Sequence, residues 1–388
     1  MNIPFNKPYF SGKETQYISE SIKSGKISGD GMFTKKCHRF FEEEMGFEKV
    51  LLTTSCTDAL EMAAILIDIQ PGDEVIMPSY TFVSTSNAFV LRGAKIIFAD
   101  SRKDHPGIDE STVEKLITSR TKVIVPVHYA GVACDMDKIM ELADKYKLFV
   151  VEDAAQSIDS FYTNKNGEKQ KLGSIGHLAA FSFHETKNII SGEGGMLVIN
   201  DKRFNGRAEI IREKGTNRSA FFRGDVDKYG WVDIGSSFLP SDIIAAYLYA
   251  QLENLDSIQD KRKLIWQNYD NAFRGILDKK YGIGLPFIPH FASNNAHMYY
   301  LICKNIEERS SLLKFLKEEG ILAVFHYLSL HKSKFFEDSY QGQELYQSDR
   351  YSNSLVRLPF FPELSMQQQD LIISKILFYY NNRKKYNN

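Results

Sequence analysis

The stretch Val150-Val151-Glu152-Asp153-Ala154-Ala155-Gln156 decides the fold class of this chain. It continues the apolar residues 148–149, and a β-branched run that ends in a carboxylate is typical of a buried parallel strand. Farther along, Lys187 stands in Ser182-Phe183-His184-Glu185-Thr186-Lys187-Asn188, directly behind a second apolar run at residues 179–183. Both patterns place a functional side chain near a sheet edge, where open α/β folds bind their ligands.

A lysine and a carboxylate in this arrangement indicate an aldehyde cofactor. Pyridoxal phosphate needs an amine that bonds to its aldehyde, and a carboxylate against its pyridine nitrogen that keeps the ring protonated. Lys187 and Asp153 are the candidates for these roles. Each also has a plainer explanation, because carboxylates at strand ends often cap the next turn and most lysines lie on the surface. The pair favours the cofactor more than either residue does alone.

Short β-branched runs alternate with helical patterns through the first part of the chain. This alternation predicts an α/β fold with a mostly parallel sheet and helices on both faces. The expected strands are residues 49–53, 74–77, 95–98, 122–127, 148–152, 179–183 and 196–200. The expected helices include residues 58–69, 136–146 and 203–214, and a helical pattern that runs from 241 towards 273.

Two domains are predicted, a large cofactor-binding domain of residues 1–250 and a small C-terminal domain of residues 251–388. The small domain is expected to be α+β, with strands at 298–303 and 322–326 and a helix at 310–319. Residues 215–237 are polar and contain glycines, and they predict a long loop with an interface or lid role.

Composition excludes several classes of protein. Lys and Arg number 48 against 49 Asp and Glu, a formal net charge of −1, so the basic surface that nucleic acid requires is missing. The cysteines are scattered without a Cys-x-x-Cys pair, which argues against a disulfide framework or a zinc site and favours the cytoplasm. Asn188 stands where His-Glu-x-x-His would need its second histidine, so no metal site is predicted. The sequence shows neither a signal peptide nor an apolar stretch long enough to cross a membrane.

Further candidate residues surround the proposed cofactor. Hydroxyl and thiol side chains between a strand and a helix, at Ser55, Cys56 and Thr57, favour a phosphate at the positive helix end, with an ordinary N-cap as the alternative. Ser182 supplies a second hydroxyl shortly before Lys187. The other candidates are Phe82 to lie on the pyridine ring, Gln156 to bond its substituents, and His326 to contact substrate.

The order of these pieces resembles the DegT/DnrJ/EryC1/StrS sugar aminotransferases, which are fold type I pyridoxal phosphate enzymes. The resemblance covers nearly the whole chain and includes residues 29–31, 55–57, 78–82, 127–131, 152–156, 182–187 and 192–195. Residues 70–78, 183–188 and 211–218 look most like the members that aminate dTDP-4-dehydro-6-deoxyglucose to dTDP-4-amino-4,6-dideoxygalactose for surface polysaccharides such as O-antigen.

The resemblance implies a role for each matching position. Lys187 bonds to the cofactor aldehyde, Asp153 meets the pyridine nitrogen, Phe82 stacks on the ring, and Gln156 lies near the ring hydroxyl. Ser55, Cys56, Thr57 and Ser182 hold the phosphate. The family often has an asparagine from the neighbouring subunit at the place of Ser237, and a serine there still donates one hydrogen bond.

The same resemblance implies a homodimer, L-glutamate as amino donor and a dTDP-linked keto sugar as acceptor. The polar stretch 215–237 is then expected to reach across the dimer, with Arg218 and Arg223 pairing with nucleotide phosphates. The resemblance leaves undecided whether the product is the galacto or the gluco epimer at C4.

Three other functions compete with this interpretation. A cofactor-dependent sugar dehydratase of the same family has histidine in place of the lysine, so Lys187 argues against it. A regulatory protein that binds cofactor or sugar without turnover stays open. A nicotinamide-dependent dehydrogenase is disfavoured, because the glycines at 192–195 precede a predicted strand and not a helix.

Overall fold

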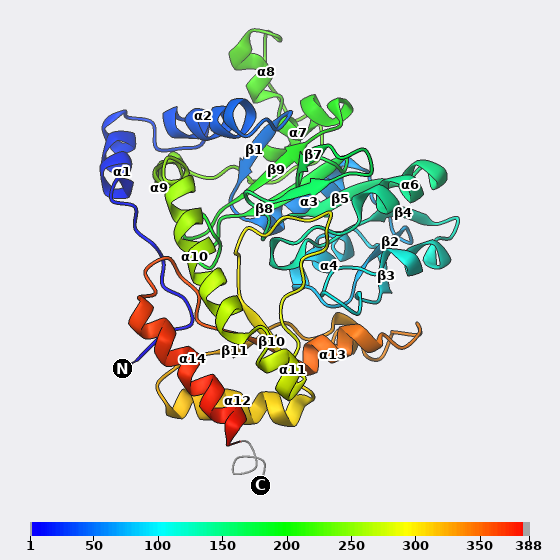
Figure 1. Cartoon of the computed structure of the whole chain (residues 1–388). Helices are drawn as coiled ribbons and strands as arrows, with labels where there is room; N and C mark the ends of the chain where they lie inside the picture. Colours follow the sequence, from blue (N-terminus) through cyan, green and yellow to red (C-terminus); the bar gives the residue numbers. More distant parts are fainter. Residues whose placement is uncertain (1, 383–388) are drawn as a thin grey trace.

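The computed structural model describes residues 2–382, and a seven-stranded sheet forms the centre of the described chain (Figure 1). In spatial order its strands are β1 (Val50–Thr53), β9 (Gly195–Ile199), β8 (Leu178–Ser182), β5 (Phe149–Asp153), β4 (Thr121–Ile124), β2 (Glu74–Pro78) and β3 (Lys95–Ala99). Strand β9 runs antiparallel to both β1 and β8, and the remaining pairs are parallel. The predicted mostly parallel sheet is therefore confirmed.

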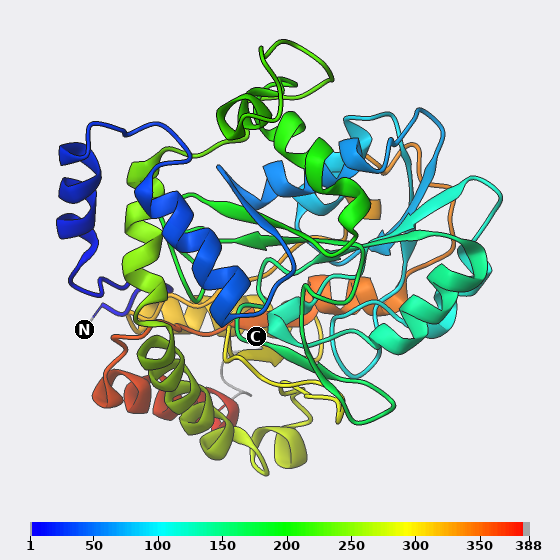
Figure 2. The ribbon, with the colours of Figure 1, turned by 90° about the horizontal axis from the view of Figure 1, so that it is seen from above.

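Helices cover both faces of this sheet (Figure 2). Alternate strand residues point to opposite faces, so Leu51 and Leu197 pack with α3 while Leu52 and Val198 pack on the other side. The helices around the sheet are α1 (Glu14–Lys23), α2 (Met32–Arg39), α3 (Cys56–Leu66), α4 (Val83–Val90), α5 (Glu110–Val113), α6 (Met136–Tyr146), α7 (Asn205–Arg212) and α9 (Asp242–Leu252). Apolar residues on both faces explain why the strand sequences read as continuous apolar runs.

Three expectations about local structure need correction. The predicted loop 215–237 contains a helix, α8 (Arg218–Arg223), which stands out from the body of the molecule (Figure 1). The helical pattern from 241 towards 273 is two helices, because α9 ends at Leu252 and α10 (Leu255–Phe273) starts after a break. A hairpin of β6 (Phe161–Thr163) and β7 (Lys169–Lys171) was not predicted, since strands of three residues are too short to show a hydrophobic period.

A three-stranded antiparallel sheet organises the C-terminal part of the chain. Its order is β10 (Tyr300–Ile302), β12 (Leu355–Arg357) and β11 (Val324–Phe325). The surrounding helices are α10, α11 (Leu277–Tyr281), α12 (Ile306–Glu318), α13 (Tyr346–Ser354) and α14 (Met366–Asn381). The strands at 298–303 and 322–326 and the helix at 310–319 are confirmed with shifted ends, and β12 is a strand that the prediction missed.

The predicted domain boundary near Gln251 falls at the end of α9. The N-terminal residues cross this division, because Ile3 pairs with Ile321 and is part of the core formed by α10, α12 and α14. We propose a large domain of residues 1–250 and a small domain of residues 251–388, and Ile3 is a residue of the first range that packs in the core of the second.

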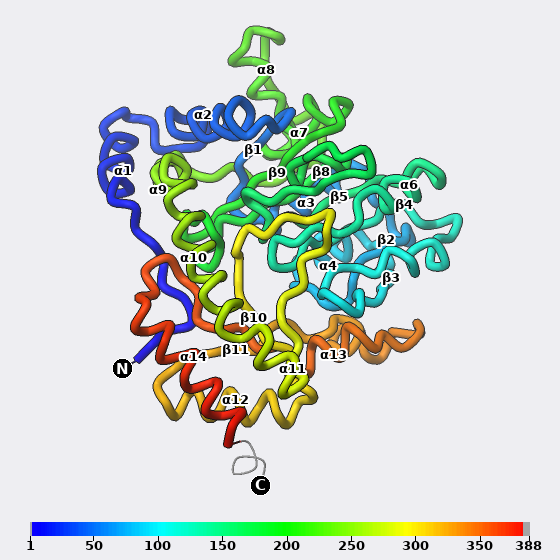
Figure 3. Tube along the Cα trace, in the orientation of Figure 1, coloured from blue at the N-terminus to red at the C-terminus, as the bar shows by residue number. Residues whose placement is uncertain are grey.

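The segment between α11 and β10, residues 283–299, joins the two parts. It runs from the small sheet up to the large sheet and back (Figure 3, yellow). There the Asn295 side-chain amide donates to the carbonyl oxygens of Gln156 and Ile158, both at 2.8 Å. No helix within residues 2–382 is long and apolar enough to span a bilayer.

Candidate active site

A cavity of about 390 Å³ lies at the carboxyl ends of the parallel strands, between the large sheet and the small domain. Asp153 ends β5, Ser182 ends β8, and Phe82 follows β2. The chain reaches the cavity from the small domain as well, through His326 and Tyr327. Most of the predicted site residues line it: Ser55, Cys56, Thr57, Phe82, Asp153, Gln156, Ser182, Lys187 and His326.

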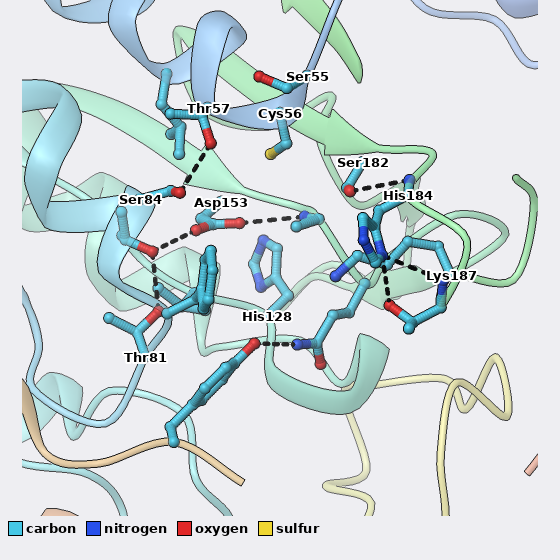
Figure 4. Close-up of a pocket in the computed structure, with 18 of the residues that line it drawn as sticks. Ser55, Cys56, Thr57, Thr81, Ser84, His128, Asp153, Ser182, His184 and Lys187 are labelled. Carbon is cyan, nitrogen blue, oxygen red and sulfur yellow. Dashed lines mark hydrogen bonds between the residues drawn. The ribbon is translucent and has the colours of Figure 1, made fainter. Parts of the chain in front are cut away.

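Asp153 is buried and held in a fixed orientation (Figure 4). The Thr85 hydroxyl donates to its Oδ2 at 2.6 Å, and the backbone N–H of Ala155 donates to its Oδ1 at 3.2 Å. Thr85 is in turn within 2.9 Å of the Thr81 hydroxyl. These two hydrogen bonds leave other lone pairs of the carboxylate oxygens free. Asp153 can therefore accept a further hydrogen bond from a group in the cavity.

The neighbouring carboxylate, Glu152, points to the opposite face of the sheet and has a structural role. It is fully buried, lies 2.9 Å from Nε2 of His128, and accepts hydrogen bonds from three backbone N–H groups, those of residues 173, 175 and 176. Burial alone raises the pKa of Glu152, but the bonds to His128 and to the backbone hold that pKa below its usual value. The Glu152–His128 pair therefore fixes the loop that follows β4, next to Asp153.

Lys187 lies in the loop that follows β8. The buried side chain of the next residue, Asn188, anchors this loop. The Asn188 side chain donates to Gln259 Oε1 at 2.8 Å and to the carbonyl oxygen of Asn295 at 2.9 Å, and its Oδ1 lies 2.7 Å from Nδ1 of His297. Burial lowers the pKa of the Lys187 amine, and the charges of Cys56 and Asp153 oppose that shift. A larger fraction of this amine is consequently neutral at a given pH than for a lysine in water.

The N-terminus of α3 faces the same cavity (Figure 4). Ser55 caps the helix, with its hydroxyl accepting from the N–H of Asp58 at 3.1 Å, and the Thr57 hydroxyl donates to Ser84 at 2.8 Å. Gly195 of β9 lies so close that a Cβ there would be 2.2 Å from the backbone of Ser55. A glycine is needed at this point for the strand to pack against the loop. Free N–H groups and hydroxyls at a helix N-terminus form a fitting site for a phosphate.

The far side of the cavity holds residues that the sequence interpretation missed. Thr85, His297, Tyr327 and Arg357 line it. Tyr327 stands in no regular hydrophobic pattern, so no sequence signal points to it. Its backbone conformation is left-handed, with a φ of 44°. Its hydroxyl accepts from the Gln156 amide at 3.1 Å, so the predicted Gln156 is held from both domains. Only two apolar residues, Leu355 and Val356, precede Arg357 in its strand, so the sequence carries too short a signal to find it.

His326, the predicted substrate contact, lies beside Tyr129. Its Nδ1 is 2.7 Å from the Tyr129 hydroxyl, and its ring stacks on Tyr327 with centroids 3.5 Å apart. Burial, followed by the charges of Arg357 and Lys187, holds the pKa of His326 well below its usual value. The imidazole is therefore neutral at pH 7 and acts as a hydrogen-bonding group.

Three predicted site residues do not line this cavity. Ser237 is exposed after the protruding segment, Arg218 packs its guanidinium against the Phe222 ring at 5.1 Å, and Arg223 pairs with Glu209 at 2.8 Å. Their assignment depends on a second copy of the chain and stays a prediction.

Comparison with known proteins identifies the family. The model of the DegT/DnrJ/EryC1/StrS aminotransferase family matches residues 8–377. The Bacillus subtilis spore coat polysaccharide biosynthesis protein SpsC is 31% identical over 386 residues, 96% of each chain.

Solved structures agree. The putative sugar aminotransferase Spr1654 from Streptococcus pneumoniae, in its PMP form, superposes with a TM-score of 0.90 at 25% identity, over 98% of this chain and all of that one. S. venezuelae DesV superposes with a TM-score of 0.87 at 28% identity, over 98% of both chains. The family match spans almost all described residues, and Spr1654 is known in PLP and PMP forms. This chain therefore belongs to the DegT/DnrJ/EryC1/StrS family and is an aminotransferase that depends on pyridoxal phosphate.

Proposed function

We propose that this enzyme transfers the amino group of L-glutamate to C4 of dTDP-4-dehydro-6-deoxyglucose, a nucleotide-linked 4-keto-6-deoxy sugar. The observation that carries the proposal is one cavity that receives Lys187 and Asp153 from the large domain, in a chain of a sugar aminotransferase family. The name of the B. subtilis relative refers to polysaccharide biosynthesis, which supports a role in making a surface glycan of the O-antigen type. We also propose a cytoplasmic location, because all four cysteines are free thiols.

The residues that line the cavity fit pyridoxal phosphate. When bound, this cofactor carries the amino group and withdraws electrons from the carbon that loses or gains a proton. Asp153 is assigned to the pyridine nitrogen, where Thr85 keeps its carboxylate aimed. Ser55, Cys56, Thr57 and Ser182 are assigned to the phosphate at the N-terminus of α3. Phe82, whose side chain is 54% exposed here, is assigned to the face of the ring, and Gln156 to the ring hydroxyl.

Lys187 is assigned two tasks at its Nζ atom. In the resting enzyme the amine holds the cofactor covalently, and during each half of the reaction it moves a proton as general base and acid. A lowered pKa serves both tasks, because only the neutral amine is a nucleophile or a base. The dehydratase alternative lacks support, since this position is lysine.

The pH dependence of cofactor capture tests the state of Lys187. Capture of pyridoxal phosphate by the apoenzyme should speed up as pH rises and level off at a lower pH than capture by a free lysine, because burial lowers the pKa of the amine. Stopped-flow absorbance between about pH 6 and 10, with Nα-acetyl-lysine as the reference amine, measures both curves. Coincident curves would contradict a perturbed amine.

We also propose a homodimer in which residues 215–237 reach the active site of the second copy. This segment stands away from its own domain and exposes aromatic side chains, with Trp231 82% and Phe222 70% exposed. Large exposed aromatic residues are typical of protein interfaces. Ser237 would then donate to a cofactor phosphate, and Arg218 and Arg223 would face the sugar nucleotide.

Arg218 offers the sharper test of this arrangement, because it forms no ion pair among the described residues whereas Arg223 already has two. Arg218→Gln should raise the KM for the dTDP-sugar about 10-fold with little change in kcat, through loss of one charge-assisted bond to a phosphate. Steady-state kinetics with Arg203→Gln, another exposed arginine that lies outside the segment, gives the control. An unchanged KM would remove Arg218 from the proposed site.

The substrate is tested directly by product analysis. The purified enzyme, pyridoxal phosphate, L-glutamate and dTDP-4-dehydro-6-deoxyglucose should give a 4-amino-4,6-dideoxy sugar that depends on all four components. NMR coupling constants at C4 then distinguish the galacto from the gluco product. Glutamate-dependent absorbance changes without any aminated sugar would reject this acceptor, and no absorbance change at all would favour a binding protein without turnover.

A further inference from the structure

His297 belongs to the segment of residues 283–299 that joins the two parts of the chain, and its ring lines the same cavity as Lys187. The residue is 3% exposed, so its polar atoms are available to a ligand in the cavity and not to bulk water. It has no part in the proposed binding of the cofactor. A buried polar side chain that faces a ligand cavity indicates a partner on the ligand.

A buried chain of hydrogen bonds fixes the orientation of the Asn188 amide. Its Nδ2 donates to Gln259 Oε1 at 2.8 Å and to the carbonyl oxygen of Asn295 at 2.9 Å. A backbone carbonyl can only accept, so the atom that faces it must be the amide nitrogen. Gln259 is oriented consistently, because its Nε2 donates to Asp159 Oδ2 at 3.1 Å. The Oδ1 atom of Asn188 is therefore the atom that faces His297.

This orientation fixes the tautomer of His297. Its Nδ1 lies 2.7 Å from Asn188 Oδ1, and an amide oxygen accepts, so Nδ1 carries the proton. The other ring nitrogen, Nε2, makes no hydrogen bond to residues 2–382. Burial, followed by the charge of Lys187, holds the pKa of His297 well below its usual value, so the ring is neutral at pH 7. Nε2 is consequently a hydrogen-bond acceptor in the cavity.

The other histidines of the cavity wall differ in this respect. His128 has both ring nitrogens engaged, by a backbone N–H at 3.2 Å and by Glu152 at 2.9 Å. His326 faces the hydroxyl of Tyr129, which can donate or accept, so its tautomer is not fixed. The side chain of His184 is 41% exposed, with Nε2 at 3.6 Å from a carboxylate. Among these four residues, the structure fixes a free acceptor nitrogen in His297.

The ligands offer few donors for such an acceptor. In the proposed function the donors of the cofactor are already assigned, its pyridine nitrogen to Asp153 and its ring hydroxyl to Gln156. L-Glutamate has N–H groups on the amine that it transfers, and its two carboxylates can only accept. The acceptor sugar is neutral around its keto carbon and carries hydroxyl groups, which donate. An unused acceptor in this cavity therefore favours the sugar over the amino acid.

The position of His297 selects one hydroxyl of the sugar. The histidine bonds directly to Asn188, the residue after Lys187, and the charge of Lys187 contributes to lowering its pKa. The ring therefore lies near the amine that moves the proton. In dTDP-4-dehydro-6-deoxyglucose the reacting carbon is C4, and of its two neighbours C3 carries a hydroxyl whereas C5 carries none. The C3 hydroxyl is thus the donor closest to the reacting carbon.

We propose that Nε2 of His297 accepts a hydrogen bond from the C3 hydroxyl of the acceptor sugar. The inference rests on the proposed function for the identity of the sugar, and it adds a residue that selects the acceptor and holds its keto carbon at Lys187. The buried chain from Asp159 through Gln259 and Asn188 keeps the ring in place for this contact. A hydroxyl held on the neighbouring carbon also orients C4 for the reaction. Loss of the contact should slow the sugar half of the reaction and leave the glutamate half unchanged.

His297→Asn removes the acceptor and keeps the structural bond. The amide N–H of asparagine can take the place of Nδ1–H towards Asn188, and asparagine has no atom at the position of Nε2. With enzyme loaded with pyridoxamine phosphate, kcat/KM for dTDP-4-dehydro-6-deoxyglucose should be about 10-fold lower in the variant than in the wild type, the loss expected for one neutral hydrogen bond. With pyridoxal phosphate and L-glutamate alone, the two proteins should agree within about 2-fold. Absorbance of the bound cofactor follows both halves.

His290→Asn is the matched control. His290 is in the same connecting segment, is exposed and does not line the cavity. It should leave both halves unchanged. An equal loss in both halves for His297→Asn would overturn the inference, because it would place the histidine on the Lys187 amine or on the cofactor. An unchanged sugar half would overturn it as well.

The 3-deoxy analogue of the sugar tests the contact from the side of the ligand. The wild-type enzyme should use it about 10-fold less efficiently than the parent sugar, whereas His297→Asn should distinguish the two sugars less than about 2-fold. A preference of equal size in both proteins would overturn the inference, since a general effect of the substitution on structure is independent of this hydroxyl.

The wild-type enzyme alone separates this inference from the proposed function, even where the variant does not fold. A wild-type enzyme inert to the parent sugar would reject the proposed acceptor and this inference with it. An active wild-type enzyme that uses the parent sugar and its 3-deoxy analogue equally well would overturn the inference and leave the proposed function intact.

Discussion

Lys187→Ala should lower the rate of amino transfer at least about 10⁴-fold while the fold is retained, because general acid–base catalysis and the covalent hold on the cofactor are both lost. The substitution removes a side chain from the cavity wall and leaves the anchor of the loop in place, since Asn188 makes the bonds to Gln259 and Asn295. The released cofactor should absorb as free aldehyde. Coupled detection of 2-oxoglutarate from L-glutamate measures the rate, and circular dichroism measures the fold.

Lys202→Ala provides the control for Lys187. Its side chain is 74% exposed and pairs with Glu48 on the surface, and it does not line the cavity. It should retain full activity. Substantial turnover by Lys187→Ala, alongside an intact Lys202 variant, would reject the assignment of the catalytic amine.

Asp153→Asn should lower the rate of the glutamate half-reaction about 100- to 1000-fold, as expected when one member of a buried charge pair is neutralised. Asparagine has the same shape, and the Thr85 hydroxyl can donate to its amide oxygen as it does to the carboxylate. The decrease in rate therefore measures the effect of removing the negative charge of Asp153. Single-turnover absorbance with L-glutamate measures it.

The same variant should also move the pH profile of cofactor capture to lower pH. The charge of Asp153 contributes to raising the pKa of Lys187, so removing that charge lowers the pKa further and makes the amine neutral at lower pH. Asp68→Asn, a surface carboxylate paired with Arg207, should change neither property. A profile that stays in place would mean that Asp153 and Lys187 do not act on a common group.

The large sheet could be predicted from the sequence because each of its strands carries a strong local signal. Runs such as Met196–Ile199 are apolar on both faces, and the helices between the strands keep a 3.6-residue pattern. The helix in the protruding segment was harder to predict. Helix α8 is short, Arg218–Arg223, and none of its residues is buried, so it carries no hydrophobic pattern. The strand β12 and the hairpin of β6 and β7 are only three residues per strand, which is too short for a period to be recognised.

Within the candidate site, the sequence by itself determined the residues that stand in local motifs. Lys187, Asp153, Gln156 and the residues before α3 are adjacent to strand ends, and strand ends of a parallel sheet meet at one edge. Only the tertiary structure decided which distant residues complete the cavity. Arg357 ends a strand of the small sheet and Tyr327 follows another strand of that sheet. Both residues line the cavity with Lys187 because residues 283–299 and the bonds of Asn295 dock the small domain on the large one. Contacts between domains depend on packing across long separations in the chain, which no local periodicity encodes.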